Sequence, residues 1–420
     1  MRHLRIGSIS TTRLALISLL WLVTGVGAGV MLDRQLLADA VPNADVPDSV
    51  MPEFKLIGEA WNMIDKVYVD RSAVKPRRMA YGAISGMVDS LGDTGHSTFL
   101  TPQELKEAHD SIEGHFAGIG AEIRMQGKHV VVVAPLDGSP ALESGLRPGD
   151  VIFKVDGKDV VGQTLEQVVR KIRGPAGSKV TLTIHEPKAE HLHDVTITRA
   201  VIHVHSVTWH MLPGTKIADV RIASFSQNTT KELMKAVDEL RAAGAHGIVL
   251  DLRSDPGGLL DQAVNVASLF LSGGNVLLEK DAQGKIHPVP VDDNIPTVEM
   301  PMVVLTNIGT ASASEILAGA LQDADRATIV GESTFGTGTV LQQFPLSDGS
   351  AVLLAVEEWL TPKGHTIWHK GIKPDDVVAL GQDVTPVLPL DLRHMTAEQF
   401  KARKDTQLLK AIELLGKGRW

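Results

Sequence analysis

Residues 302–315 have the sequence M-V-V-L-T-N-I-G-T-A-S-A-S-E, in which an apolar run leads through a serine-containing turn into a helical pattern. Residues 302–305 predict a buried strand, and residues 314–321 predict a helix. Ser312 lies at the junction, where free backbone N–H groups and the positive end of the helix dipole stabilise developing negative charge. The spacing of Ser312 and Glu315 is equally that of a capping box. On this stretch alone, a helix cap is the simpler interpretation.

Strand and helix patterns alternate on both sides of this stretch. Strands are predicted at residues 217–222, 247–252 and 328–330, and helices at residues 231–242 and 259–270. Such alternation predicts an α/β sheet covered by helices, with functional groups in the loops that follow the strands. Residues 251–258, D-L-R-S-D-P-G-G, form one such loop, whose glycines let a backbone N–H approach a ligand closely.

An earlier segment, residues 115–200, is rich in strand patterns. Within it, Ser139-Pro140 predicts the start of a short helix, and Asp156-Gly157 predicts a hairpin after a strand at residues 151–155. This pattern resembles a PDZ domain. Gly118, Ile119 and Gly120 resemble the loop by which such domains hold the terminal carboxylate of a peptide that adds to the sheet edge. An ordinary small β domain is the alternative.

Several further motifs occur in a consistent order. They are T-A-S-A-S-E at 310–315, G-E-S-T-F-G-T-G-T-V at 331–340, P-L-S-D-G-S at 345–350 and G-I-K-P-D at 371–375. With the D-P-G-G turn, they resemble the carboxy-terminal processing (tail-specific) serine protease family over residues 54–380. The resemblance implies an α/β protease core with an inserted PDZ-like β-rich domain and an N-terminal helical module.

The resemblance also implies roles for particular residues. The family's nucleophile matches Ser312, and its oxyanion donors match the backbone N–H groups of Gly258 and Ala313. The family's base is a lysine, but Thr337 occupies its position, and Leu341 occupies that of the glutamine which orients it. A threonine hydroxyl is too weak a base near neutral pH. The chain is therefore predicted to be a variant without the usual catalytic lysine.

A histidine offers a replacement for that base. Residues 91–97, L-G-D-T-G-H-S, form a loop one residue longer than its family counterpart, which favours His96 as the base. Related proteases of the tricorn type use a histidine from this part of the chain with a serine and a glutamate. Glu358 is preferred to Glu357 as the orienting carboxylate, because strand alternation lets only one of them face inward. A displaced lysine remains an alternative base.

These observations favour an exported serine endopeptidase that binds the C-terminal tails of protein substrates. The alternative is a catalytically inactive PDZ-bearing scaffold. A formal charge of −9 without a basic stripe argues against a nucleic-acid partner, and the absence of cysteine excludes disulfides and thiolate sites. Histidine pairs on predicted strands lack further ligands on the same face, so neither a metal nor a cofactor is expected.

The sequence divides into six predicted segments. Residues 1–40 contain basic residues before an apolar run and predict a membrane anchor or a signal segment, with the body of the protein outside the cytoplasm. The expected boundaries are a linker at 41–53, the helical module at 54–105, the PDZ-like domain at 106–200, the protease core at 201–385 and a helical tail at 386–420. Amphipathic helices in that tail either pack on the core or mediate homo-oligomer contacts.

Overall fold

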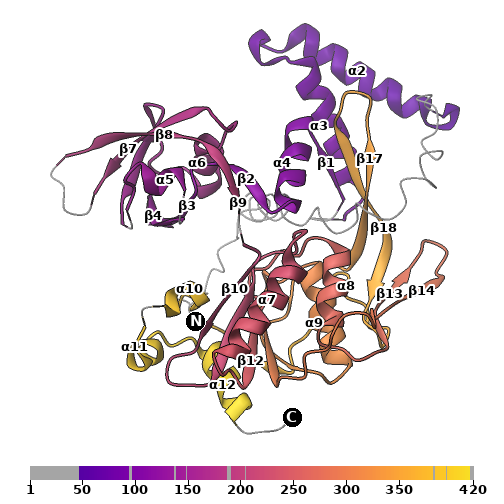
Figure 1. Cartoon of the computed structure of the whole chain (residues 1–420). Helices are drawn as coiled ribbons and strands as arrows, with labels where there is room; N and C mark the ends of the chain where they lie inside the picture. The colour runs from indigo at the N-terminus through magenta and orange to yellow at the C-terminus, as the bar shows by residue number, and fades with distance from the viewer. Residues whose placement is uncertain are drawn as a thin grey trace, which may run out of the picture. The chain divides into compact units, whose positions relative to one another are not determined.

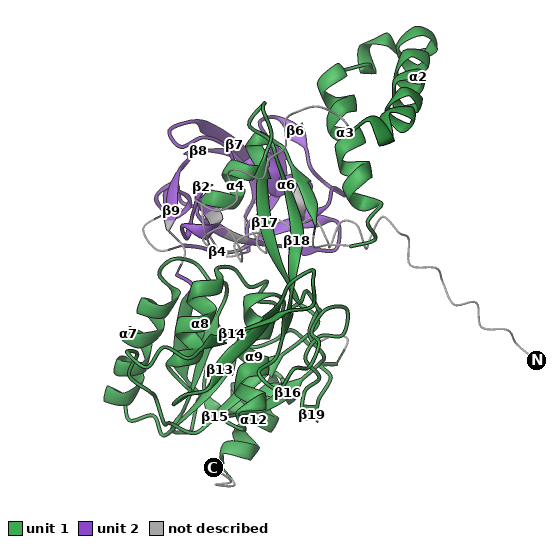
Figure 2. Ribbon diagram, turned by 90° about the vertical axis from the view of Figure 1, so that its right-hand side faces the viewer, with its two compact units in different colours: residues 1–109, 207–420 green, residues 110–206 purple. Residues whose placement is uncertain are grey.

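A six-stranded sheet forms the centre of the larger of two compact units in this computed structural model (Figure 1). The structure describes residues 47–93, 97–136, 139–147, 149–186, 191–203, 205–381, 384–393 and 395–416. The larger unit, green in Figure 2, joins the described residues up to His109 with those from Val207, and the smaller unit spans Asp110–Ser206. The predicted membrane or signal segment and His96 lie outside the described residues.

The central sheet is mostly parallel. In sheet order its strands are β10 (Val207–Met211), β11 (Ile217–Ile222), β12 (Gly247–Asp251), β15 (Met302–Thr306), β16 (Thr328–Gly331) and β19 (Asp376–Val377). Only β10 runs antiparallel to its neighbour. Every residue of β12 and β15 is buried, as is typical of parallel strands covered on both faces. Because Asp251 pairs with Leu305, the loops that follow these two strands leave the same edge of the sheet.

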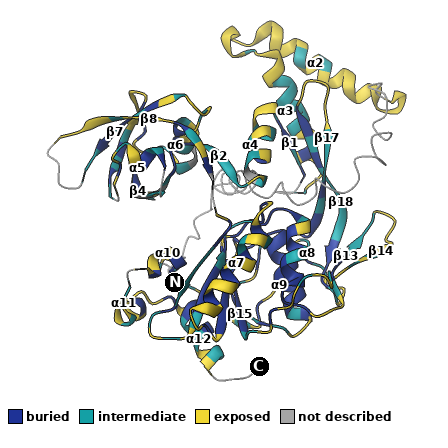
Figure 3. Cartoon of the chain, in the orientation of Figure 1, coloured by how far each residue is buried: buried dark blue, intermediate teal, exposed yellow. Residues whose placement is uncertain are grey.

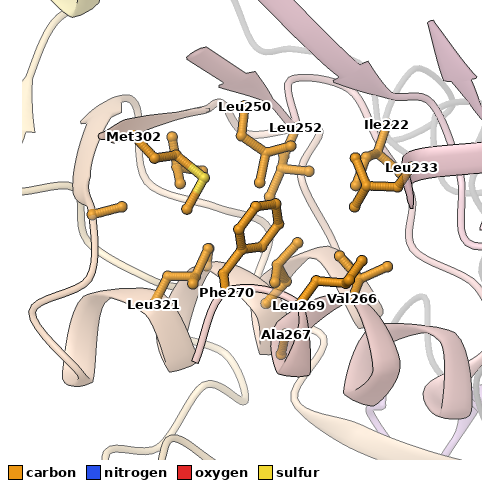
Figure 4. Close-up of a cluster of buried hydrophobic side chains, with 14 of the residues drawn as sticks. Ile222, Leu233, Leu250, Leu252, Val266, Ala267, Leu269, Phe270, Met302 and Leu321 are labelled. Atoms are coloured by element: carbon orange, nitrogen blue, oxygen red, sulfur yellow. The ribbon is translucent and has the colours of Figure 1, made fainter. Parts of the chain in front are cut away.

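Helices cover both faces of this sheet, as the sequence pattern predicts. One face packs against α7 (Thr229–Ala242), α8 (Leu260–Ser268) and α9 (Ala313–Asp323), and the other against α10 (Pro389–Leu392), α11 (Ala397–Ala402) and α12 (Thr406–Gly416). In Figure 4, apolar side chains from strands and helices gather around Phe270, which is 1% exposed. The dense apolar packing on this face fixes α9, and therefore Ser312, against the sheet.

A buried ion-pair network attaches the C-terminal helices to the central sheet. The guanidinium of Arg253 donates to Asp251 at 2.8 Å and to Asp405, one residue before α12, at 2.9 Å. All three side chains are almost fully buried. Burial and the neighbouring Asp251 raise the pKa of Asp219, which lies on the adjacent strand. Removing one partner of such a network leaves an uncompensated buried charge, so the C-terminal segment is an integral part of this unit.

A second, antiparallel sheet belongs to the same unit. It consists of β1 (Thr98–Leu100), β18 (Ala351–Leu360), β13 (Asn275–Lys280) and β14 (Ile286–Pro290), with β17 (Thr339–Pro345) also paired to β18. The pairing of β17 with β18 shifts register between Val340 and Leu341, which leaves Val356 without a partner. Strand β1 pairs with β18, so backbone hydrogen bonds as well as helix packing join the N-terminal segment to the rest of the larger unit.

The N-terminal module contains α2 (Met51–Val67), α3 (Pro76–Asp89) and α4 (Pro102–Ile112), with 3₁₀ turns η2 (Asp48–Val50) and η3 (Arg71–Ala73). Prolines begin these helices where an N–H would have no partner. No residue of α2 is buried, as its yellow colour in Figure 3 indicates. No helix in the described ranges is long and apolar enough to cross a membrane.

The smaller unit is a β-rich domain with two helices. Its main sheet contains β3 (Ala121–Gln126), β4 (His129–Pro135), β5 (Val151–Val155), β6 (Lys158–Asp159), β7 (Lys179–His185) and β8 (His193–Thr198). Strand β2 (His115–Gly118) pairs with β9 (Ala200–His203), and the helices are α5 (Pro140–Glu143) and α6 (Leu165–Ile172). The predicted hairpin at Asp156-Gly157 is confirmed, because both residues have positive φ angles, 50° and 73°. The predicted helix start is confirmed as well, because Ser139 caps α5.

Candidate active site

Ser312 holds an unusual backbone conformation at the start of α9. Its φ of 56° and ψ of −122° lie in a region that residues other than glycine rarely adopt. Such a conformation costs about 1–3 kcal/mol and persists only where the surroundings enforce it. The surrounding fold therefore enforces a backbone conformation at Ser312 that a helix cap alone does not require.

The carboxylate of Glu315 fixes this turn. Its Oε2 accepts the N–H of Ser312 at 2.9 Å and the N–H of Thr337 at 2.8 Å, while Oε1 accepts the N–H of Gly336 at 2.7 Å and the hydroxyl of Thr334. Burial raises the pKa of Glu315, and these hydrogen bonds oppose the rise. The sequence identified Glu315 only as a capping residue. Its second role, as a bridge to residues 334–337, depends on contacts across the fold.

Two glycines bring the D-P-G-G loop against the serine. Gly257 has a φ of +93°, and a Cβ placed on it would lie 2.7 Å from the Cβ of Ser312. Gly258 has a φ of +146°, and a Cβ there would lie 2.2 Å from the carbonyl oxygen of Phe225. The loop therefore approaches the backbone around Ser312 and Phe225 closely, and only glycine fits at either position.

The two predicted oxyanion donors are the backbone N–H groups of Gly258 and Ala313. Gly258 follows the glycine that touches Ser312, and Ala313 is the first residue of α9, where an N–H has no partner within the helix. Among the residues that the structure describes, no acceptor is found for the N–H of Gly258 or of Ala313. Two unpaired donors beside a hydroxyl can stabilise the negative charge that develops when an oxygen attacks a carbonyl.

Thr337 lies close to the serine. Because the N–H groups of Ser312 and Thr337 share one acceptor oxygen, their nitrogens are at most two hydrogen-bond lengths apart. Thr337 is 9% exposed, and Leu341 is 6% exposed, while Gln342 lies on the other face of β17. The position at which the resemblance places a lysine, Thr337, is thus inside the site but carries a hydroxyl. The position of the glutamine, Leu341, is buried and carries a hydrocarbon.

Glu358 has a partner of its own. Its Oε2 accepts a hydrogen bond from Lys280 at 2.9 Å, and no contact between Glu358 and Ser312 is found in the described part of the chain. Glu357 and Glu358 pair with consecutive residues of β17, Val340 and Thr339, so the two carboxylates lie on opposite faces of β18. The register shift at Val356 precedes both residues and does not change this alternation.

The loop that carries His96 is attached to β18 at its described ends. The hydroxyl of Ser97 donates to Asp93 at 2.6 Å and accepts the N–H of Ala355 at 2.9 Å. Ala355 lies three residues before Glu358 on the same strand. His96 itself lies outside the described residues.

The predicted peptide-binding loop belongs to the smaller unit. Gly120 has a φ of +74°, and Ile119 is 4% exposed. The carbonyl oxygens of Ile119 and Gly120 accept N–H groups of Ala141 and Leu136, at 2.8 and 2.9 Å. These bonds fix the loop through its carbonyl groups.

No role was predicted for Asp255, which also belongs to the site. Its Oδ1 accepts the N–H of Gly257 at 2.8 Å, and the side chain is fully buried. The available signal was an acid immediately before a Pro-Gly-Gly turn at the end of a buried strand. That pattern does not predict the charge state of the carboxyl, which forms no ion pair among the described residues.

Comparison with known proteins agrees with this geometry. Residues 216–378 match Peptidase family S41, and residues 131–186 match the PDZ domain. The carboxy-terminal processing protease CtpA of Bacillus subtilis is 37% identical over 322 residues, which cover 77% of this chain and 68% of that protein. A protein of Staphylococcus haemolyticus named "Probable CtpA-like serine protease" is 36% identical over 367 residues, 87% of this chain and 72% of that one.

A solved S41 protease structure from Bacteroides fragilis has the same fold, with a TM-score of 0.53, 17% identity, and coverage of 84% of this chain and 97% of that one. By the similarity to the Bacillus and Staphylococcus proteins, the chain belongs to peptidase family S41, as a carboxy-terminal processing serine protease with a PDZ domain. The predicted family and fold class are confirmed. The substrates of such an endopeptidase are peptides or proteins.

Proposed function

We propose that Ser312 hydrolyses peptide bonds by acyl transfer, with His96 in place of the family's lysine. His96 takes the hydroxyl proton as Oγ of Ser312 attacks the scissile carbonyl, and it then gives that proton to the leaving amine. The N–H groups of Gly258 and Ala313 donate to the oxyanion. A water molecule attacks the acyl-enzyme, loses its proton to His96 and releases Ser312, which regains its hydroxyl proton. Glu358 orients the imidazole.

One observation carries the proposal: Ser312 has a strained backbone conformation at the start of α9, and the N–H of the next residue, Ala313, has no acceptor among the described residues. A binding protein has no need for a serine in such a conformation, because a glycine there would avoid the strain. This favours an active enzyme over the inactive scaffold, although Thr337 replaces the lysine.

The attachment of Ser97 to β18 supports the roles of His96 and Glu358. Ser97 follows His96 in the chain and bonds to Ala355 on the strand that carries Glu358. The ion pair of Glu358 with Lys280 does not preclude the orienting role, because Lys280 is 42% exposed and an ion pair open to solvent is weak.

The substrates proposed are proteins with an exposed C-terminal tail. Gly118, Ile119 and Gly120 form the loop whose backbone N–H groups receive the terminal carboxylate, and the tail adds as a strand to the domain's sheet. The basic residues and apolar run of residues 1–40 support a location outside the cytoplasm, with that segment as anchor or signal. Mass analysis of the mature N-terminus in a membrane fraction would separate an anchor from a cleaved signal.

The test is covalent labelling of the full chain with a fluorophosphonate probe, followed by location of the adduct by mass spectrometry. Labelling at Ser312 is expected, with loss in Ser312→Ala and a fall of about 10²–10⁴-fold in His96→Ala. The matched control is His365→Ala, because His365 is exposed and paired with Asp323 at the far end of α9. Labelling that survives His96→Ala would reject His96 as the base. No labelling, with C-terminal peptides still bound, would favour the scaffold.

A further inference from the structure

Asp255 connects the D-P-G-G loop to both sides of the serine turn. Its carbonyl oxygen accepts the N–H of Ala311 at 2.9 Å and the hydroxyl of Ser314 at 3.2 Å. Its side-chain Oδ1 accepts the N–H of Gly257, whose Cα lies against Ser312. One residue therefore holds the backbone on which both the nucleophile and the Gly258 donor depend.

The second carboxyl oxygen of Asp255 is buried without a partner. Among the described residues, Oδ2 has no hydrogen bond, and no lysine, arginine or histidine forms an ion pair with this carboxyl. Of the side chains around it, the hydroxyl of Ser314 is the nearest polar group, and it also bonds to the Asp255 carbonyl. A neutral carboxyl fits such surroundings better than a carboxylate does, because an isolated buried charge is costly.

The charged groups around Asp255 do not reverse this preference. Arg221 on β11 favours the carboxylate, but it donates to the carbonyl oxygen of Arg253 and lies 3.7 Å from Asp251. Asp251 on β12 opposes the carboxylate, and Arg253 is engaged by Asp251 and Asp405. On α9, the carboxylate of Glu315 is held by hydrogen bonds from residues 312 and 334–337. Burial dominates and raises the pKa of Asp255 to about 8.

We propose that Asp255 is a positioning residue for acyl transfer. In its neutral form, Asp255 holds the Gly257-Gly258 backbone for oxyanion binding, and its ionisation stops acylation. The inference rests on the proposed function of Ser312. Loss of the carboxyl proton to solvent places a negative charge beside the position where the oxyanion forms. Two like charges at close range in a buried site repel each other strongly, so the transition state rises in free energy.

This effect is separable from the titration of the base. A histidine base must be unprotonated, so it limits the rate at low pH, whereas Asp255 must be protonated and limits the rate at high pH. Asp255→Asn keeps the shape of the side chain and an oxygen for the N–H of Gly257, and its amide donates where the carboxyl proton would. The substitution removes only the ionisation.

The experiment measures the rate constant of Ser312 labelling by the fluorophosphonate probe in the full chain, from about pH 5 to about pH 10. For the unmodified protein, we expect a tenfold fall per pH unit above about pH 8. Asp255→Asn should show no alkaline fall, so that the ratio of its rate to that of the unmodified protein rises about 100-fold between neutrality and two units above the midpoint. Asp261→Asn, a change of an exposed carboxyl on α8, is the matched control and should follow the unmodified protein.

Three results would overturn the inference. An alkaline fall that persists in Asp255→Asn would show that another group titrates. A folded Asp255→Asn that does not label at any pH would show that a neutral isostere is insufficient. No labelling of the unmodified protein at any pH would reject the proposed function, and this inference with it.

A second measurement does not depend on catalysis. In the Ser312→Ala protein, the infrared carboxyl band that disappears when Asp255→Asn is added should titrate at the same midpoint as the labelling rate. A different midpoint would contradict the assignment.

Discussion

The strained conformation of Ser312 has a measurable consequence for stability. Ser312→Ala and Ser312→Gly both remove the hydroxyl and hence the nucleophile, but only the alanine variant keeps a Cβ on a backbone with a φ of 56° and a ψ of −122°. Comparison of the two variants therefore isolates the cost of that conformation from any effect of activity.

The expected difference follows from the structure. A residue with a side chain pays about 1–3 kcal/mol in this region, which glycine avoids. Glycine also makes the unfolded chain more flexible, which offsets about 0.4–1 kcal/mol of that gain. The Cβ that is lost lies against Gly257, so some packing is lost as well. We expect Ser312→Gly to be more stable than Ser312→Ala by about 1–2 kcal/mol.

The assay is thermal or urea unfolding of the two full-length variants, followed by tryptophan fluorescence. Trp359 is fully buried in the same apolar core as α9 and reports on the larger unit. For a unit of this size, the expected gain corresponds to a melting temperature about 2–6 °C higher for Ser312→Gly. Equal melting temperatures, or a more stable alanine variant, would refute the claim that Ser312 is strained.

Three further predictions concern the same site. Thr337→Lys combined with Leu341→Gln restores the amine and the amide of the family pattern, and should recover labelling in a His96→Ala background; no recovery would mean that Thr337 does not occupy the base position. Glu315→Gln replaces one of the two acceptor oxygens by an NH₂ donor, costs about 1–3 kcal/mol for each N–H left unpaired, and should lower the melting temperature and abolish labelling. For Asp255, the folded pKa of about 8 exceeds the ordinary value of 3.8, so the folded state binds the extra proton between these values. Stability conferred by this group is therefore complete below about pH 4 and is lost as the pH rises to about 8, which amounts to on the order of 5 kcal/mol. Urea unfolding should show Asp255→Asn gaining on the unmodified protein across that range, and a constant difference would contradict the assignment.

Local signals in the sequence located most of the site. The apolar runs predicted strands at residues 247–252 and 302–305, and the alternation of strands with helices predicted a sheet covered by helices. The D-P-G-G and T-A-S-A-S-E segments follow directly on those strands. Since parallel neighbours end at one edge of the sheet, these segments had to meet there.

Alternation along a single strand was a partial guide. It places Glu357 and Glu358 on opposite faces of β18, but the register shift of β17 against β18 at Val356 depends on the partner strand, so a pattern within one strand does not contain it.

The sequence by itself determined the family, the order of the domains, the serine turn and the glycines that approach it, because each depends on residues close together in the chain. Only the tertiary structure decided how those residues are held and charged. Glu315 bridges to Thr337, and Asp255 is buried with no ion-pair partner among the described residues, through contacts between segments far apart in sequence. Burial and hydrogen bonding set the energy of a charged group, and both are properties of the folded surroundings.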